Sequence, residues 1–378
     1  MPAVASRRGV SVLVSFVIAA YNAEATIERC VCSCTGQSES ELEVIVVDDG
    51  STDGTARVVE TMAGADGRIR LVQQANAGVS AARNTGIEAA KGVYVCFADA
   101  DDFVSPWFVE AMWRTVEEDG GWPGIVFFRF AQSHAPAYTF ERPTGVAARV
   151  SFEEMLPLCL NPFAQDELLR AKPGSSWAKA YSRSLLDESG ARFPVGVRFN
   201  EDVVFNLSLL LHANAAGVRS FPFVDTVMYC YVNNADSATH AYRPGALAEC
   251  EKSAVAYWDA ARGCLGQRAD WDERIYSRLF SNIEALYAQN IVLDKESGYS
   301  DKRERFFALC RFHPVSLSVS EWCPEKMGAM VRMLHWCASH GMFLPAFLYS
   351  YPYNALRCAK GALRRIEARL KARAVMAK

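Results

Sequence analysis

The stretch VIVVDDGSTDGT, residues 44–55, decides the predicted fold of this 378-residue chain. An apolar, β-branched run leads directly into Asp48 and Asp49 and then into a glycine turn, after which Thr55–Met62 has the spacing of a helix. A continuous apolar strand that is followed by a helix is typical of a parallel sheet covered on both faces. Ligands of such sheets bind at the carboxyl ends of the strands, so the two aspartates are candidate site residues.

The same alternation of strands and helices extends on both sides of this stretch. Apolar, β-rich runs lie at Val12–Ala19, Glu43–Val47, Ile69–Gln73 and Val93–Ala98. Helical patterns separate them at Thr26–Ser33, Thr55–Met62 and Val79–Ala90. The order βαβαβαβ predicts an α/β fold, with a mostly parallel sheet that is flanked by helices.

Residues 6–25, SRRGVSVLVSFVIAAYNAEA, fit two different structures. Two arginines, a short apolar run and a series of small residues are typical of a secretory signal peptide. The same apolar run also fits a buried strand. We favour the strand, because the runs that follow need a central neighbour to complete a parallel sheet.

Charge and cysteine content restrict the partners and the compartment. Forty basic and forty-three acidic residues give a net charge of −3, which does not favour nucleic acid as a partner. The twelve cysteines are scattered without CxxC pairs, as reduced core cysteines are. We do not favour a metal site at Cys30, Cys32 and Cys34, because only the first and last share a helical face and no histidine is near. The sequence lacks an apolar run of about 18 residues, which argues against a membrane-spanning helix.

The pattern changes along the second half of the chain. Ser105 and Pro106 begin a helix that runs to about Glu118. Further elements are expected as strands at Ile125–Phe130, Val218–Ser220 and Asp225–Tyr231 and as a helix at Glu201–Leu211. From about residue 242 only helical patterns remain. We therefore predict two domains, the sheet domain at residues 1–240 and a helical domain at residues 241–378.

A second group of acids leaves the fourth predicted strand in FADADDF, residues 97–103. Asp99 and Asp101 alternate with a small residue and Asp102 follows, an arrangement that can hold Mg²⁺ or Mn²⁺ together with two phosphates. Three acids so close together repel each other without a cation or a donor. Between the two acidic groups, NAGVSAARNTGI at residues 76–87 places Arg83 on a helix, where it can reach an anionic or carbonyl group. For Asp48 and Asp49 of the first acidic group the alternative role is helix capping, and Asp53 in particular can be a cap alone.

Five segments together resemble one known family. They are IAAYNAE (18–24), VIVVDDGSTDGT (44–55), NAGVSAARNTGI (76–87), FADADDF (97–103) and NEDVVF (200–205). In this order and spacing they look like the family-2 glycosyltransferases of the GT-A fold. The resemblance covers residues 11–235 and implies a Rossmann-like GT-A domain that binds a nucleotide sugar, carries a metal-binding DxD motif and inverts the sugar's configuration.

The resemblance also implies a role for individual residues in donor binding. It implies that the nucleotide sugar is contacted by the turn after the first strand, by the DDGS acids, by the arginine of the ARN segment and by the first acid of the DxD motif. In this chain these residues are Ala20, Tyr21 and Glu24, then Asp48 and Asp49, then Arg83, and finally Asp99. The metal, Mn²⁺ or Mg²⁺, is implied to bind Asp99 and Asp101.

For catalysis, the resemblance implies that the ED pair of NEDVVF supplies the general base. Successive helical residues point about 100° apart, so only one acid can face the sugar, and the family pattern selects Asp202 with Glu201 in support. The segment SSWAKAYSRSLL, residues 175–186, is similar to the family's acceptor-side region. Trp177 and Lys179 are therefore further candidates for the site.

The C-terminal segment from Arg357 to Lys378 has a pattern of its own. It carries eight Lys or Arg residues against the single acid Glu367, while apolar residues recur at helical spacing at Leu356, Leu363, Ile366 and Leu370. This pattern predicts a basic amphipathic helix that can lie on an anionic membrane surface. The alternative is a solvated helix that docks on its own protein.

The sequence as a whole predicts an inverting, metal-dependent glycosyltransferase. The expected donor is a nucleotide diphosphate sugar, a UDP-sugar in the first place, and the expected acceptor is the hydroxyl of a carbohydrate or a lipid-linked sugar. Such an enzyme would serve the synthesis of cell-surface or capsular polysaccharide or of glycolipid. Its expected location is the cytoplasm, at the inner face of the plasma membrane if the C-terminal helix binds lipid.

Two alternatives to this function remain. A nucleotidyltransferase that makes nucleotide sugars can share the sheet and the paired acids, but it would need a basic, glycine-rich loop where AAYNAEAT, residues 19–26, has no Lys or Arg. A catalytically inactive, carbohydrate-binding relative would be expected to lose an acid from one of the three acidic motifs. None of these acids is missing.

Overall fold

The computed structural model of the protein describes residues 14–119, 124–133, 137–144, 148–160, 172–233, 245–324 and 327–350. The chain separates into two compact units. The first ends at Val232 and contains the sheet, and the second contains the helices from residue 246 onward. The predicted basic helix at residues 357–378 lies outside the described residues.

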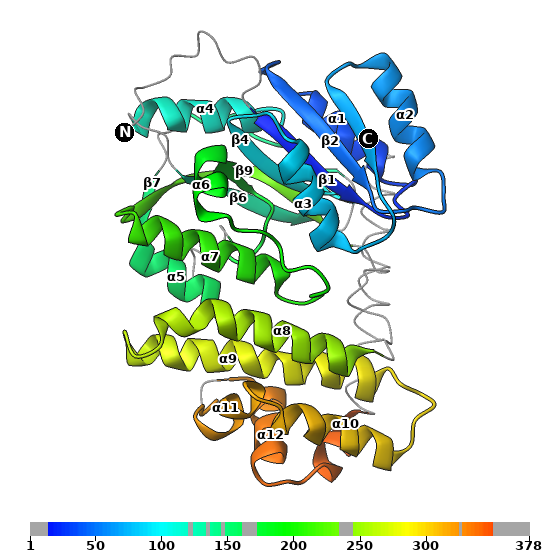
Figure 1. Ribbon diagram of the computed structural model, residues 1–378, viewed down its shortest axis with the longest axis vertical. Coiled ribbons are helices and arrows are strands. Elements are labelled where there is room, and N and C mark those ends of the chain that lie inside the picture. Colours follow the sequence, from blue (N-terminus) through cyan, green and yellow to red (C-terminus); the bar gives the residue numbers. More distant parts are fainter. Residues whose placement is uncertain are drawn as a thin grey trace. The chain divides into compact units, whose positions relative to one another are not determined.

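A mixed sheet forms the centre of the first unit (Figure 1). Its order is β3-β2-β1-β4-β8-β6-β9-β5, with β7 paired to β9. The strands are β1 (Val14–Ala20), β2 (Leu42–Asp48), β3 (Ile69–Gln73), β4 (Tyr94–Asp99), β5 (Phe103–Val104), β6 (Ile125–Ser133), β7 (Ala148–Ser151), β8 (Lys179–Ser182) and β9 (Ser220–Val232). Strands β1 to β4 are parallel, as the βαβ pattern predicts, while β8 runs antiparallel to β4 and β6. Since β1 pairs with both β2 and β4, residues 14–20 are a central strand, which confirms the strand prediction for this part of the chain.

Helices cover both faces of the sheet (Figure 1). On one face lie α1 (Ile27–Thr35), α2 (Thr55–Ala65) and α4 (Phe108–Asp119). On the other lie α3 (Val79–Ala89) and α7 (Glu201–Ala215), where Gly86 of α3 meets Val17 and Phe205 of α7 meets Phe97. Two shorter helices, α5 (Phe152–Leu160) and α6 (Arg183–Ser189), complete the unit.

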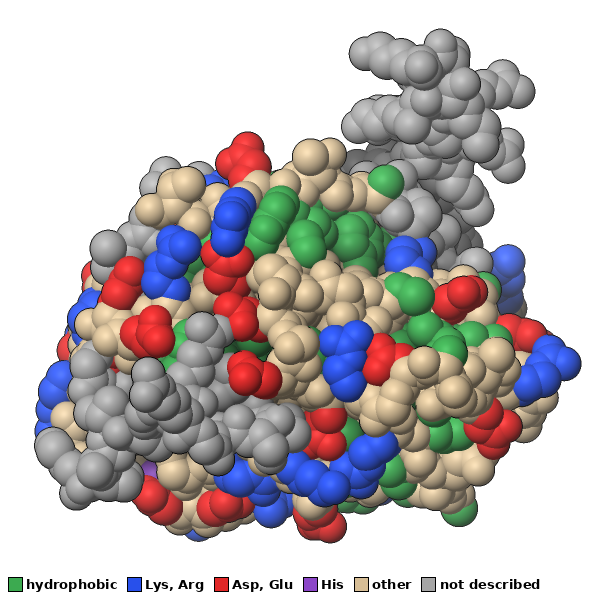
Figure 2. All heavy atoms as spheres, turned by 90° about the horizontal axis from the view of Figure 1, so that it is seen from above, with side chains coloured by type: hydrophobic (Ala, Val, Ile, Leu, Met, Phe, Trp, Pro, Cys, Tyr) green, Lys and Arg blue, Asp and Glu red, His purple; other side chains and the backbone are tan. Residues whose placement is uncertain are grey.

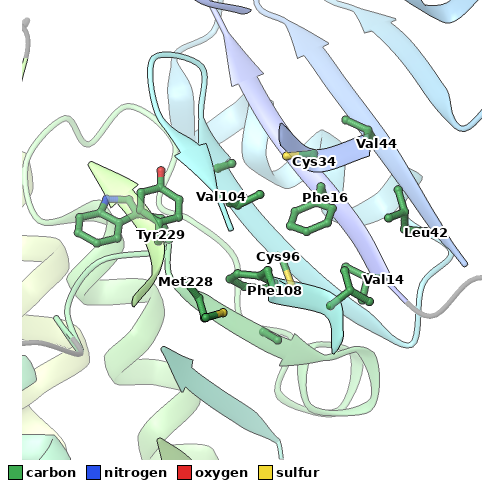
Figure 3. Close-up of a cluster of buried hydrophobic side chains, with 14 of the residues drawn as sticks. Val14, Phe16, Cys34, Leu42, Val44, Cys96, Val104, Phe108, Met228 and Tyr229 are labelled. Carbon is green, nitrogen blue, oxygen red and sulfur yellow. The ribbon is translucent and has the colours of Figure 1, made fainter. Parts of the chain in front are cut away.

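The main core lies between the sheet and α1, α2 and α4. Figure 3 shows part of it, where Val14 and Phe16 of β1 meet Cys34 of α1 and Phe108 of α4. The rings of Phe16 and Phe108 are 5.6 Å apart. Because β1 and β2 are buried on both faces, their side chains are apolar in an almost continuous run, which is why the sequence predicts them well.

The later strands differ from the prediction. The expected strands Val218–Ser220 and Asp225–Tyr231 form one strand, β9, that passes through Pro222. Pro222 pairs only with β7, and the ladder to β6 begins after it at Phe223, so the missing N–H is not needed there. The short antiparallel strands β5, β7 and β8 have two to four residues each, too few for a readable alternation.

The regular secondary structure among the described residues of the second unit is all helical. Its helices are α8 (Ala246–Ala261), η3 (Arg262–Cys264), α9 (Ala269–Leu286), the π-helical turn η4 (Tyr287–Val292), α10 (Tyr299–Arg311), α11 (Val315–Ser320) and α12 (Ala329–Ser339). Among the residues described, no helix is long and apolar enough to cross a membrane.

Acidic and basic side chains are interspersed on the face of the molecule shown in Figure 2, in agreement with the small net charge of the chain.

Candidate functional site

Arg83 brings three sequence motifs together. Helix α3 begins after Gly78, whose φ of 90° is readily adopted by glycine. Arg83 lies in the second turn of this helix, and its side chain is only 6% exposed. The guanidinium donates from Nη2 to Oδ1 of Asp99 at 2.9 Å and from Nη1 to Oδ1 of Asp202 at 2.6 Å. A longer contact of 3.4 Å joins Nη1 to Oε1 of Glu201. The end of β4 and the start of α7 therefore meet at one buried cation.

Aromatic packing fixes these elements relative to each other. The Arg83 guanidinium lies over the ring of Phe193 at 5.2 Å, and Phe193 stacks on Phe205 of α7 with 4.0 Å between ring centroids. Phe97 of β4 makes edge contacts with both rings. This aromatic cluster thus includes Phe97, two positions before Asp99, and Phe205, three positions after Asp202. It therefore limits how far the two carboxylates can move apart.

The electrostatics of the cluster follow from burial and charge. Burial opposes the charge on Arg83, but Asp202, Asp99 and Glu201 outweigh it and raise the pKa of Arg83. Burial and the neighbouring Asp202 raise the pKa of Glu201 to about 8, although Arg83 counteracts them. Desolvation likewise raises the pKa of Asp99, with further contributions from Asp202 and Asp101. One arginine stands against three acids in this cluster, and the excess of negative charge contributes to the raised pKa of Asp99 and of Glu201.

Asp202 is held on both carboxylate oxygens. Besides the bond from Arg83, its Oδ2 accepts from the backbone N–H of Ser176 at 3.0 Å and from the Ser176 hydroxyl at 3.1 Å. The Asp202 side chain keeps an exposed fraction of 19%. It can therefore still meet a small group from solution.

Asp99 and Asp101 leave β4 at alternate positions, and both are partly exposed. Within the part of the chain that the structure describes, no three His, Cys, Asp or Glu side chains lie close enough to hold a metal alone. Two carboxylates at a strand end nevertheless match what Mg²⁺ or Mn²⁺ takes from proteins, since phosphates of a substrate and waters supply the other ligands. The donor set fits a cation that arrives with a diphosphate.

Asp102 faces the interior instead. It is completely buried, and it accepts from the hydroxyl of Tyr229 at 2.6 Å and from the N–H of Val232 at 2.7 Å. The Tyr229 oxygen in turn accepts from the backbone N–H of Asp99 at 3.1 Å. Asp102 therefore supports the backbone that presents Asp99. Burial, then Asp99, raises the pKa of Asp102 to about 8.

This buried acid predicts a pH dependence of stability. The pKa of Asp102 is higher in the folded state than its usual value of 3.8, so the folded state binds more protons between these values. The free energy of unfolding should therefore decline as the pH rises from about 4 through about 8. We expect Asp102→Asn, which does not titrate, to show a smaller decline in melting temperature between pH 5 and pH 8.5 than the wild type. Parallel curves for the two proteins would contradict the assignment.

The remaining residues implied in nucleotide binding lie at the ends of β1 and β2 and in the two loops that follow these strands, which are hydrogen-bonded together. Asp49 accepts from Gln74, Ala77 N–H and Gly78 N–H, and so supports the start of α3, while Asp48 accepts from Ser51 N–H. The backbone N–H of Asp49 donates to the carbonyl of Ala20.

Glu24 and Tyr21 occupy different positions in the first of these loops. Glu24 accepts from the N–H of Gly54 at 2.9 Å, and a Cβ at Gly54 would lie 2.1 Å from this carboxylate, so a larger residue there would displace the Glu24 side chain. Tyr21 is 53% exposed. Ser80, in the first turn of α3, has a buried hydroxyl that meets no hydrogen-bond partner in the described chain.

Trp177 and Lys179 are buried beside the acids. Trp177 stacks on Tyr229 with 4.9 Å between ring centroids and also on Tyr231. Lys179 is fully buried, and burial lowers its pKa to about 7. Its Nζ donates to backbone carbonyls of residues 172, 175 and 177 and to a serine hydroxyl. Both side chains therefore shape the wall of the site from inside.

The sequence did not reveal several residues of this cluster. Phe193, Ser176 and Tyr229 contact the predicted acids or Arg83, yet each lies in a segment without a readable acidic or glycine-rich motif. For Ser176 the only available signal was its place directly before Trp177. Asn22, which accepts from the Thr52 N–H and helps to join the two donor-side loops, was also missed.

Comparison with known proteins gives a consistent result. Residues 15–146 match the family model described as Glycosyl transferase family 2. The uncharacterized glycosyltransferase EpsJ of Bacillus subtilis (strain 168) is 34% identical over 237 residues, which are 61% of this chain and 64% of EpsJ. The putative glycosyltransferase EpsH of the same organism is 30% identical over 61% of this chain and 63% of its own length. The chain thus spans less than two thirds of these curated relatives.

Solved structures support the fold over a longer range. The crystal structure of S. aureus TarS 1-349 in complex with UDP-GlcNAc has a TM-score of 0.59 and 18% identity, and the match covers 92% of each chain. A second crystal structure of S. aureus TarS 1-349 has a TM-score of 0.55 and 17% identity. These matches confirm the predicted fold class, a GT-A type α/β sheet flanked by helices with a helical C-terminal region.

Proposed function

We propose that this protein is a family-2 glycosyltransferase, as the match of residues 15–146 to that family model suggests, and that it moves a sugar from a nucleotide diphosphate sugar to an acceptor hydroxyl with inversion. The observation that carries the proposal is the contact of Arg83 with Asp99 at the end of β4 and with Glu201 and Asp202 at the start of α7. Asp99, which we place on the side of the diphosphate, and Asp202, the candidate base, thus contact the same guanidinium group.

The proposed chemistry is a single displacement. The acceptor oxygen attacks the anomeric carbon while the bond from that carbon to the diphosphate oxygen breaks, and the bonding electrons leave with the nucleotide diphosphate. The acceptor proton passes to a carboxylate on the opposite face of the sugar, which we assign to Asp202. Burial and the neighbouring Asp202 raise the pKa of Glu201, which favours its protonated form, so we assign it a supporting role.

Asp99 and Asp101 are the residues that would hold Mn²⁺ or Mg²⁺. When bound there, the cation would neutralise charge on the leaving diphosphate. The unpartnered hydroxyl of Ser80 and the exposed ring of Tyr21 are the groups we assign to the nucleotide, next to the loops that Asp48, Asp49 and Glu24 organise. UDP is the favoured nucleotide, since the solved structure of TarS 1-349, which shares the fold, was determined with UDP-GlcNAc.

A panel of nucleotide sugars tests this function. With Mn²⁺, we expect the protein to release the nucleoside diphosphate from at least one of UDP-glucose, UDP-galactose, UDP-N-acetylglucosamine, GDP-mannose and dTDP-glucose. Release of pyrophosphate from a nucleoside triphosphate and a sugar phosphate would indicate the alternative nucleotidyltransferase. Donor binding without turnover, in the presence of glycan acceptors, would indicate the inactive carbohydrate-binding alternative.

For the acceptor, we propose a carbohydrate or a lipid-linked sugar used in cell-surface or capsular polysaccharide or glycolipid synthesis. The names of EpsJ and EpsH identify glycosyltransferases, and neither name states an acceptor. The support for a lipid-linked acceptor is the basic, amphipathic sequence pattern of residues 357–378, which suits the anionic inner face of the plasma membrane. We therefore propose a cytoplasmic protein that binds this face peripherally.

Deletion of residues 357–378 tests the membrane proposal. We expect the truncated protein to co-sediment less with vesicles that contain anionic lipid, and to keep its hydrolysis of soluble donor. Each basic residue near such a surface contributes about 1 kcal/mol, so the binding lost on truncation should be the salt-sensitive part. Neutral phosphatidylcholine vesicles are the control. Equal sedimentation of both proteins with anionic vesicles would exclude this segment as the membrane anchor.

A further inference from the structure

Ser176 donates twice to Oδ2 of Asp202, the carboxylate oxygen that Arg83 does not contact. Its N–H and its hydroxyl both donate to Oδ2 of Asp202, at 3.0 and 3.1 Å, and Ser176 itself is completely buried. Because no water can reach this serine, the hydroxyl cannot be replaced by solvent when it is removed. The contact is therefore a fixed part of the environment of Asp202.

The contacts of Asp202 leave a defined position for a further donor. An ionised carboxylate has about four lone-pair positions. Arg83 occupies one on Oδ1, and the two donors of Ser176 occupy those on Oδ2. One lone pair on Oδ1 then remains for a further donor, and the Asp202 side chain as a whole has an exposed fraction of 19%. Ser176 and Arg83 together thus set the direction in which Asp202 accepts a proton.

The loop that carries Ser176 is built around the buried amino group of Lys179. Lys179 Nζ donates to the carbonyl oxygens of Lys172 at 2.8 Å and of Ser175 at 2.6 Å, which closes the chain into a ring around the ammonium group. Lys172 and Ala178, at the two ends of this loop, have φ values of 35° and 54°, a region that costs free energy for residues other than glycine. Such strain persists only where surrounding contacts hold it, and it is found most often at functional sites.

Neighbouring elements hold the same loop from outside. The hydroxyl of Tyr181 donates to the carbonyl oxygen of Ser176 at 3.1 Å, and Asn206 of α7 donates to that of Ser175 at 2.9 Å. Trp177 forms an isolated parallel bridge with Phe97 of β4, two residues before Asp99. The loop therefore connects the strand that carries Asp99 to the helix that carries Asp202.

We propose that Ser176 is a positioning residue, which fixes the Asp202 carboxylate for proton transfer through the loop that is organised around Lys179. This inference rests on the proposed function for its effect on rate. Ser176 touches no reacting atom in this role. Its hydroxyl acts on the reaction through the orientation of Asp202 alone.

A double-mutant cycle with Asp202→Asn tests the proposal. With the fastest donor of the nucleotide-sugar panel, we expect Ser176→Ala to lower kcat about tenfold and to leave the donor KM nearly unchanged, since a bond to a charged group is lost while donor contacts remain. In the Asp202→Asn background, the same change should lower the residual rate less than about twofold, because no carboxylate remains to be oriented. The matched control is Ser184→Ala, an exposed serine on α6, which should not alter kcat. An equal factor in both backgrounds would assign Ser176 a merely structural effect and overturn the proposal.

A stability cycle on the same variants separates this inference from the proposed function. If Ser176 holds Asp202, the losses in unfolding free energy of Ser176→Ala and Asp202→Asn should be less than additive in the double variant. If the stability losses are less than additive but the protein turns over none of the donors, the contact is supported and the proposed function is rejected. Additive losses would overturn the contact whatever the activity.

Discussion

Asp202→Asn is expected to lower the rate of sugar transfer at least about a hundredfold, because a positioned general base contributes about 10²–10⁴-fold to rate. The amide keeps the shape of the side chain but offers no basic oxygen. If Asp202 served only to stabilise the start of α7, the effect on rate would be far smaller. An acid in the first turn gains only about 0.3–1 kcal/mol from its interaction with the helix dipole. The two explanations therefore differ clearly in size.

Transfer rate, donor affinity and melting temperature should be measured together on this variant. The side-chain amide has a single acceptor oxygen and cannot accept from both Arg83 and Ser176, so we expect a small fall in melting temperature, and nearly unchanged donor affinity. Glu201→Gln is the matched comparison, because it changes the adjacent acid in the same helical turn. A normal rate in Asp202→Asn with a slow Glu201→Gln would assign the base to Glu201. Normal rates in both variants would contradict the displacement mechanism.

Asp101→Asn is expected to weaken Mn²⁺-dependent binding of UDP by at least about a hundredfold, since even the loss of an outer-shell partner of a metal ligand typically costs about 10–100-fold. The side chain is partly exposed at the end of β4, so the fold should persist. Calorimetric titration of UDP, with and without Mn²⁺, measures the effect directly.

Asp66→Asn is the matched control for this measurement. Asp66 precedes β3 and so lies at the amino ends of the parallel strands, at the edge of the sheet opposite to Asp99 and Asp101. Its loss should leave Mn²⁺-dependent UDP binding intact. Unchanged UDP affinity in Asp101→Asn, or binding that never depends on Mn²⁺, would exclude the metal role of this acid.

The first four strands and their helices were predictable from the sequence. Strands such as β2 are buried on both faces, so their side chains form continuous apolar runs, and helices such as α3 begin after glycine turns. These are local properties, visible in a few neighbouring residues. The acidic motifs were readable for the same reason, since Asp48 and Asp99 each end an apolar run.

The three-dimensional assembly of the candidate site depended on contacts between distant residues. Arg83 and Asp202 are 119 positions apart in the chain, and their contact depends on the packing of Phe193 between α3 and α7. No period or local motif encodes such a contact. Family resemblance suggested that these residues share a site, whereas their mutual hydrogen bonds came from the structure alone.

Residue order alone was enough to predict the α/β alternation, the acids at the strand ends and the position of Asp202 at the start of a helix. The burial of Asp102 against Tyr229, the place of Lys179 inside a loop and the contact of Ser176 with Asp202 became visible in the three-dimensional structure. The physical reason is that the chemistry of a carboxylate or an ammonium group depends on its burial and its partners, which are set by the whole fold. Asp102 illustrates this. In the sequence it is one of three aspartates in FADADDF, whereas in the folded protein burial raises its pKa to about 8.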